Sequence, residues 1–190
     1  MKSERHGQAK VLTPTEIERL FAEGLESARD RALFGVCLYG GCRIAEACQA
    51  QTSDVYTSAG RVKPRLILRK AATKGKLATR SIPIATALVP LLEAYAPLAG
   101  KNYLFSGRWG RGHLHPDSAD KLLRAACQRV DLEGVSTHSF RRTALTRLSA
   151  AGVPLRVIQE LSGHKTLSAL QRYLEVGEEE VERAIAALTF

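Results

Sequence analysis

Four residues in the C-terminal third of the chain have the types and spacing needed to act on a phosphodiester. His138 and Arg141 are three positions apart, so they would share one face of a helix. The hydroxyl residues just before His138 are good N-caps, and the free N–H groups of a helix start attract anions. A second histidine, His164, and a phenol, Tyr173, follow. This combination predicts attack on a phosphodiester with the phenol as nucleophile.

The order and spacing of these residues resemble the signature of the tyrosine recombinases, or phage-integrase family. That signature is H-x-x-R, then a G-H pair, then a tyrosine nine positions after the second histidine. Here residues 138–141 give H-x-x-R, Gly163-His164 gives G-H, and Tyr173 stands nine positions after His164. H-x-x-R alone arises by chance, whereas all three parts in order are specific. The resemblance covers residues 12–188 and implies a mostly helical α+β fold with a small antiparallel sheet.

An upstream box resembles the same family. Gly41, Arg43 and Glu46 match its G-x-R-x-x-E pattern. By spacing alone, Arg43 and Glu46 would form only a surface ion pair worth a few tenths of a kcal/mol. The resemblance implies that Arg43 is a catalytic arginine and that Glu46 orients it.

The middle of the chain reads as a hairpin. Residues 65–68 and 80–84 are β-prone and flank a basic turn, residues 70–79. In the family such a turn carries a catalytic lysine that protonates the 5′-oxygen leaving group. Lys74 is the best match to this catalytic lysine, and Lys76 is the alternative. The other interpretation is an ordinary solvated Lys-rich turn.

The resemblance also implies roles for the remaining residues in cleaving and rejoining DNA strands without metal or cofactor. Tyr173 would attack the scissile phosphate and form a 3′-phosphotyrosyl link. Arg43 and Arg141 would bind the non-bridging oxygens and stabilise the transition state. His138 would act as general acid or base near the phenol, and His164 would donate to the phosphate.

The formal net charge of +9 indicates a polyanionic partner, and double-stranded DNA is the expected one. The segment 98–119 is rich in Gly and Arg and is predicted to be a loop. Its His113-x-His115 pair is not expected to bind metal, because no Cys or carboxylate cluster lies nearby. Further residues predicted to contact DNA are Lys76, Arg80, Arg108, Arg111 and Arg142.

The four cysteines contain no C-x-x-C spacing, so we expect buried free thiols in a reducing compartment. No signal peptide or membrane-spanning run is visible, which predicts a cytoplasmic protein that associates with the nucleoid when bound to DNA. The cysteines are Cys37, Cys42, Cys48 and Cys127.

At 190 residues the chain is expected to form one domain. Residues 1–11 are polar and predicted to be flexible, and residues 12–190 form the catalytic domain. The N-terminal core-binding domain that the family usually carries is expected to be missing. Residues 178–190 have apolar side chains at helical spacing, which predicts self-association as a dimer or tetramer on DNA.

Two alternatives stay open. The pattern of residues 143–174 also fits a helix–turn–helix, which would suit a non-catalytic DNA-binding module. That interpretation does not explain why Arg43, His138, Arg141, His164 and Tyr173 occur together. A type IB topoisomerase-like enzyme would share the phosphotyrosine chemistry. One departure from the family pattern is Ser162, which stands where Leu commonly precedes the G-H pair.

Overall fold

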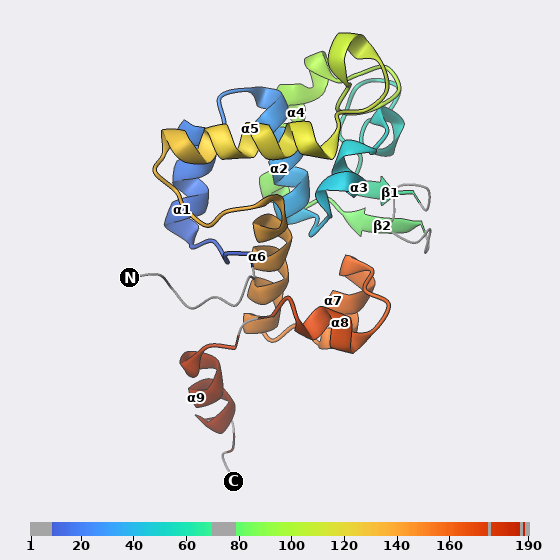
Figure 1. Cartoon of the computed structure of the whole chain (residues 1–190). Helices are drawn as coiled ribbons and strands as arrows, with labels where there is room; N and C mark the ends of the chain where they lie inside the picture. The colour runs from blue at the N-terminus through green and yellow to red at the C-terminus, as the bar shows by residue number, and fades with distance from the viewer. Residues whose placement is uncertain (1–8, 70–78, 175, 187, 189–190) are drawn as a thin grey trace.

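The computed structural model describes residues 9–69, 79–174, 176–186 and 188. It is mostly helical with one two-stranded antiparallel sheet, which confirms the predicted fold class (Figure 1). The α-helices and strands, in order, are α1 (Pro14–Arg19), α2 (Ala28–Tyr39), α3 (Ile44–Cys48), β1 (Arg65–Leu68), β2 (Arg80–Pro83), α4 (Val89–Tyr95), α5 (Pro116–Arg129), α6 (Thr137–Ala150), α7 (Leu155–Ser162), α8 (Leu167–Gln171) and α9 (Glu178–Ala186).

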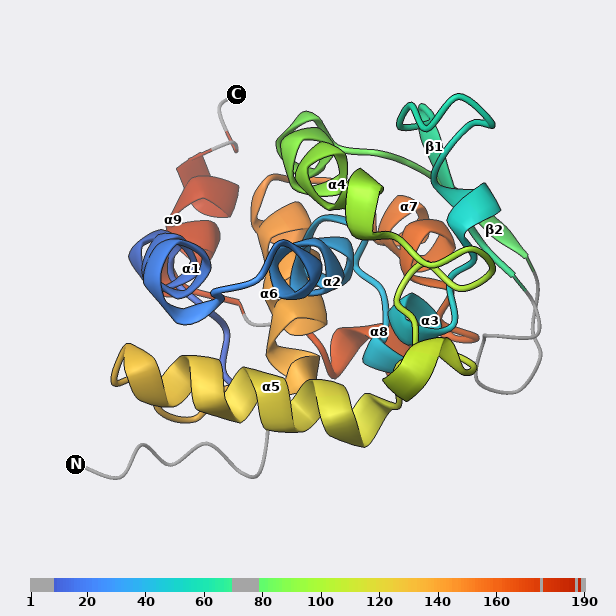
Figure 2. The ribbon, with the colours of Figure 1, turned by 90° about the horizontal axis from the view of Figure 1, so that it is seen from above.

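Helix α2 lies at the centre of the main body, with α1, α4, α5 and α6 around it (Figure 2). It is buried on most sides, as expected for a helix that is apolar nearly all round. Phe34 of α2 stacks on Phe140 of α6 with ring centroids 5.1 Å apart. The helix begins at Ala28 because Ser27 caps it by accepting a hydrogen bond from the Asp30 N–H.

The sheet pairs β1 with β2 in the register Leu66↔Ile82 and Leu68↔Arg80. Leu66 and Ile82 are buried. Because side chains in a strand alternate with a period of two, Arg80 shares the inner face with Ile82. The sheet therefore aims one arginine into the protein, toward α3 and α7.

Helix α6 connects two apolar clusters. Phe140, near its start, belongs to the main core, and Leu145, one turn further on, packs with Ile158 of α7 and Leu170 of α8. Figure 1 shows α7 and α8 grouped at the lower end of α6. Arg141 lies between these clusters on the same helix, so the side chain most relevant to chemistry sits at their junction.

The first described residues are attached to α6. Ala9 accepts a hydrogen bond from Arg142 at 2.5 Å, and the Leu12 N–H donates to Thr143 Oγ1 at 2.8 Å. Leu12 itself is buried. Residues 9–12 are therefore tied to the helical body, and residues 1–8 of the segment predicted to be flexible lie outside the described residues.

The four cysteines are buried and unpaired, as predicted. Within the described residues, no helix combines the length and apolar character needed to cross a membrane.

Candidate active site

The N-terminus of α3 anchors the site. Gly41 adopts a left-handed φ of 57°, which favours glycine, and turns the chain from α2 into α3. Arg43 occupies the N-cap, and the Glu46 carboxylate accepts its backbone N–H at 2.9 Å. The same carboxylate accepts the Arg43 Nη1 at 3.0 Å, and its side chain is 1% exposed. The predicted pair exists, and its carboxylate is buried instead of lying at the surface.

Arg80 reaches the same carboxylate from β2. Its Nη2 donates to Glu46 Oε2 at 2.9 Å, and its Nη1 donates to the Leu161 carbonyl at 2.8 Å. Gly163 ends α7 with a φ of 66°, and a Cβ there would meet Arg80 Nη1 at 2.6 Å. The glycine of the G-H pair is thus needed both for its left-handed backbone and for the close approach of Arg80.

Among the described residues, Arg141 is the largest fully buried side chain. Its Nη1 donates to the Gly41 carbonyl at 2.6 Å and its Nη2 to the Ser162 carbonyl at 2.8 Å. Glu46 Oε2 lies 3.9 Å from Nη1. Burial, with Arg43 adding to it, lowers the pKa of Arg141 to about 10, so this guanidinium remains charged at neutral pH.

His164 packs beside Arg141 directly after α7. Arg141 Nη2 lies 3.4 Å from Nδ1 and 3.2 Å from Nε2 of the imidazole. A donor almost equally close to both ring nitrogens lies over the ring face and not in line with either lone pair. Burial, reinforced by Arg141, Arg43 and Arg80, lowers the pKa of His164 to about 3. The imidazole is therefore neutral at physiological pH.

Tyr173 follows α8 and completes the group. Its ring centroid is 4.9 Å from that of His164, and the Arg141 guanidinium carbon lies 5.6 Å from it. The Tyr173 carbonyl accepts Thr146 Oγ1 at 3.1 Å, which ties this segment to α6. His138 is exposed and shares with Tyr173 a hollow of about 550 Å³. The phenol is thus flanked by Arg141 and His164 and borders the same hollow as His138.

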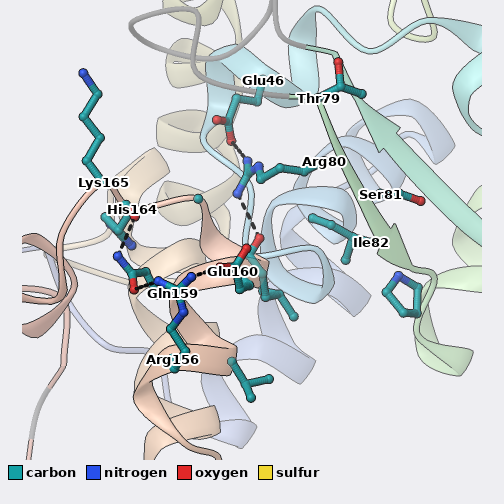
Figure 3. A pocket seen from close by; sticks show the side chains of 14 residues that line it. Glu46, Thr79, Arg80, Ser81, Ile82, Arg156, Gln159, Glu160, His164 and Lys165 are labelled. Carbon is teal, nitrogen blue, oxygen red and sulfur yellow. Dashed lines mark hydrogen bonds and ion pairs between the residues drawn. The ribbon is translucent and has the colours of Figure 1, made fainter.

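A second hollow, of about 710 Å³, lies between β2 and α7 (Figure 3). Glu46 and Arg80 form one wall, His164 and Gln159 another, and the Lys165 side chain extends away from them. Three guanidinium groups share the Glu46 carboxylate, and that of Arg80 lines this hollow, so two positive charges remain unbalanced within the described residues. The Nε atoms of Arg80 and Arg141 are buried and have no hydrogen-bond partner among those residues. Such a site suits an anion with several acceptor oxygens.

The predicted lysines, Lys74 and Lys76, lie outside the described residues. Arg69, just before that turn, is fixed by Nε and Nη2 to the Asp54 carboxylate at 2.8 and 2.6 Å. Arg142, predicted to contact DNA, is 5% exposed and holds Ala9 instead of facing outward.

Arg80 was predicted only as a DNA contact, and its pairing with Glu46 was missed because no motif marked it. Arg108 and Arg111 are exposed. His113 and His115 contact Leu114 O and Asp117, and the described residues contain no group of three metal-type ligands.

Comparison with known proteins places this chain in one family. The model for the phage integrase family matches residues 10–180. The chain is 30% identical over 181 residues to a tyrosine recombinase of Thermosipho africanus, covering 93% of this chain and 61% of that protein. It is 36% identical over 158 residues to tyrosine recombinase XerC of Rhodospirillum centenum, covering 80% and 43%.

Solved structures agree on the fold. XerA recombinase superposes with a TM-score of 0.78 at 22% identity, covering 94% of this chain and 64% of that one. XerH recombinase bound to its palindromic difH substrate gives 0.75 at 21% identity, covering 95% and 53%. The fold is that of a tyrosine recombinase catalytic domain. The chain belongs to the phage integrase family, and it spans about three fifths of the length of the Thermosipho relative.

Proposed function

We propose that this chain cleaves and rejoins DNA strands as a site-specific tyrosine recombinase, through a covalent phosphotyrosyl intermediate. The observation that carries the proposal is the convergence of Arg43, Arg80 and Arg141 on one buried carboxylate, with Arg141 also lying beside the Tyr173 ring. Two unbalanced positive charges next to a phenol fit a phosphodiester better than a neutral or cationic substrate.

In the proposed mechanism the negative charge of the scissile phosphate balances the excess positive charge of the three arginines. Arg43 and Arg141 bind its non-bridging oxygens and stabilise the charge of the pentavalent transition state. The neutral His164 donates one hydrogen bond to the phosphate. Tyr173 Oη forms the new bond to phosphorus while the 5′-oxygen leaves, and His138 accepts the phenol proton. The leaving oxygen takes a proton from the turn lysine, Lys74 or Lys76.

The covalent link conserves the energy of the phosphodiester bond, so rejoining is the same step run backward by a 5′-hydroxyl. The positive charge comes from guanidinium groups of the chain itself. We therefore expect the adduct to form in the presence of EDTA.

Self-association on DNA is part of the proposal, and α9 is the candidate element. Val181 and Ile185, one turn apart on α9, are 55% and 64% exposed, and Leu188 beyond the helix is 62% exposed. Such an apolar row on a surface is typical of an interface. A neighbouring copy on the same DNA is the partner we infer.

The proposal is tested by incubating the protein with nicked and supercoiled plasmid DNA and resolving a protein–DNA adduct on a denaturing gel. The wild-type chain is expected to form the adduct, and Tyr173→Phe to bind DNA but form none. Tyr103→Phe, which changes a tyrosine outside the site, is the matched control and should form it. Absence of any adduct with the wild type would favour the helix–turn–helix module without chemistry. Plasmid relaxation without two-site recombination would favour the topoisomerase-like alternative.

A further inference from the structure

The chain's only tryptophan lies at the tip of a hairpin outside the active site. Trp109 is 83% exposed and has a left-handed backbone, with φ 59° and ψ 26°. A bulky residue adopts this conformation only where the surrounding structure enforces it. Here a bridge between Ser106 and His113 closes the hairpin, and the next glycine, Gly110, has a φ of 70°. The hairpin therefore holds an indole in solvent, where it has no role in the core.

The surface around this tip is basic. Arg108 lies over the indole with its guanidinium carbon 5.5 Å from the ring centroid. A hollow of about 440 Å³ next to the tip has no acidic residue in its lining, although Asp30 pairs with Arg29 and Asp117 with His115 at its edge. The basic and histidine residues that line the hollow are Arg29, Arg108, Arg111, His113 and His115.

The hairpin base is bonded to the segment that follows α3. Leu104 N donates to the Ala50 carbonyl at 2.8 Å, and Thr52 N donates to the Asn102 carbonyl at 3.0 Å. Helix α3 spans roughly 8 Å from its N-cap Arg43 to its last residue. Figures 1 and 2 both place the segment before α5 beside α3. The base of the hairpin is therefore held to the segment that directly follows the helix capped by Arg43.

We propose that residues 106–113 form a second DNA contact, in which Trp109 packs against sugars and base edges beside the scissile phosphate. Arg108 and Arg111 would bind backbone phosphates on either side of the indole. An exposed aromatic ring between arginines suits nucleic acid, because bases and sugars offer flat surfaces and phosphates offer charge. This inference rests on the proposed function, since it places the hairpin on the DNA that Tyr173 cleaves.

The single tryptophan makes the test direct. Titrating the protein with sonicated plasmid duplex is expected to quench or shift Trp109 emission and to protect it from acrylamide. Trp109→Ala and Arg108→Gln are each expected to weaken duplex binding at least about fivefold. Adduct formation at saturating DNA should persist in both. Arg124→Gln, which removes a charge already paired with Asp120 on α5, is the matched control.

If the wild type forms the adduct but Trp109 emission does not change, the inference is overturned and the proposed function stands. Full duplex affinity in Trp109→Ala overturns it too, as does emission that changes only with single-stranded poly(dT). A wild type that gives neither binding nor adduct removes the proposed function, and the hairpin assignment with it.

A separate observation concerns Ser162. This hydroxyl is fully buried and lies 2.7 Å from His164 Nδ1, and it is 3.3 Å from the Gln159 carbonyl, which can accept its proton. A serine has one hydroxyl proton, and the shorter contact is the stronger hydrogen bond. Gln159 Nε2 also donates to the His164 carbonyl at 3.1 Å, which fixes the residue's backbone.

We infer that Ser162 is a positioning residue that selects the tautomer of His164. If the hydroxyl donates to Nδ1, the proton of the neutral imidazole resides on Nε2. Only that tautomer has an N–H on the side away from Ser162, where a phosphate oxygen can accept it. An aliphatic residue at position 162 leaves the tautomer unselected. The catalytic part of this inference rests on the proposed function, whereas the tautomer itself does not.

Nitrogen-15 NMR of histidine-labelled protein tests this without DNA. The wild type is expected to show His164 protonated at Nε2, and Ser162→Ala to show a mixture of tautomers. The single-turnover cleavage rate of Ser162→Ala at saturating DNA should fall roughly two- to tenfold, and Ser162→Thr should restore it. Ser168→Ala, on the exposed side of α8, is the matched control. Wild-type His164 protonated at Nδ1 overturns the inference, as does an unmixed Nε2 tautomer in Ser162→Ala.

Discussion

The charged cluster around Glu46 and the C-terminal helix α9 differ in how deeply their side chains are buried. Arg141 and Glu46 are buried, and each contacts residues far away in the sequence, such as Gly41, Ser162 and Arg80. The apolar side chains of α9 are largely exposed. Buried charges must be held in one geometry, because each loses hydration that only fixed partners replace. An exposed apolar helix is free to bury its face against another molecule. The charged cluster thus has one fixed geometry, whereas α9 leaves its apolar face exposed.

Arg141→Ala should give the largest effect. The transition state loses a guanidinium that touches it, so the single-turnover cleavage rate is expected to fall about 10²- to 10³-fold. Arg141→Lys keeps the charge but lacks the fork that bonds Gly41 and Ser162, so its rate should also fall well below that of the wild type. Arg124→Ala, an exposed arginine of α5, is the control. Cleavage by Arg141→Ala at the wild-type rate would show that the cluster is not the catalytic centre.

Glu46→Gln should destabilise the fold itself. Removing the carboxylate leaves three arginines without their shared partner, and breaking a buried ion pair costs about 3 kcal/mol of unfolding free energy. The net charge of the cluster rises from +2 to +3, so sulfate should stabilise this variant more than the wild type. Chemical denaturation with and without sulfate measures both the loss of unfolding free energy and the stabilisation by sulfate.

Glu160→Gln is the matched control for that substitution. Glu160 is 68% exposed and pairs with Arg156 at the rim of the same hollow. Its loss should change the unfolding free energy by less than about 0.5 kcal/mol. An equal loss in the two variants would remove the distinction between buried and surface charges in this site.

The sequence predicted both strands, because β-prone residues mark them locally, and it predicted the fold class through its resemblance to a known family. Through the spacing of a known family it also named Arg141 and His164, which lie beside the Tyr173 ring. It could not predict that Arg80 pairs with Glu46, because that contact joins positions 34 apart and depends on how the sheet meets α3 and α7. The Ser162–His164 contact likewise follows from the left-handed turn at Gly163, which only the folded backbone shows.

A smaller effect should appear in the pH dependence of stability. His164 has an ordinary pKa near 6.5 when unfolded and a pKa of about 3 when folded, so between these values the unfolded chain binds one more proton. Stability should therefore fall as the pH decreases from 6.5, and His164 should contribute about 1.4 kcal/mol for each pH unit. The groups that face it are Arg141, Arg43, Arg80, Glu46 and Tyr173.

Denaturant unfolding of His164→Gln between about pH 6 and pH 4 measures this contribution. The variant should show a shallower dependence on pH than the wild type. His115→Gln, which changes an exposed histidine, should keep the wild-type slope. If the unfolding free energies of wild type and His164→Gln change equally with pH, His164 is not held neutral by the cluster.

Deleting residues 178–190 should have the smallest effect on the fold and a clear effect on assembly. Val181 and Ile185 bury little area within the chain, so their removal should change the unfolding free energy by less than about 1 kcal/mol. Multimeric complexes on DNA, resolved by native gel, should decrease, while monomer binding persists. Val181→Ser with Ile185→Ser keeps the helix and should reproduce the assembly defect. A stability loss as large as that of Glu46→Gln would show that α9 packs on its own domain. Multimeric complexes at full yield without α9 would place the contact between copies elsewhere.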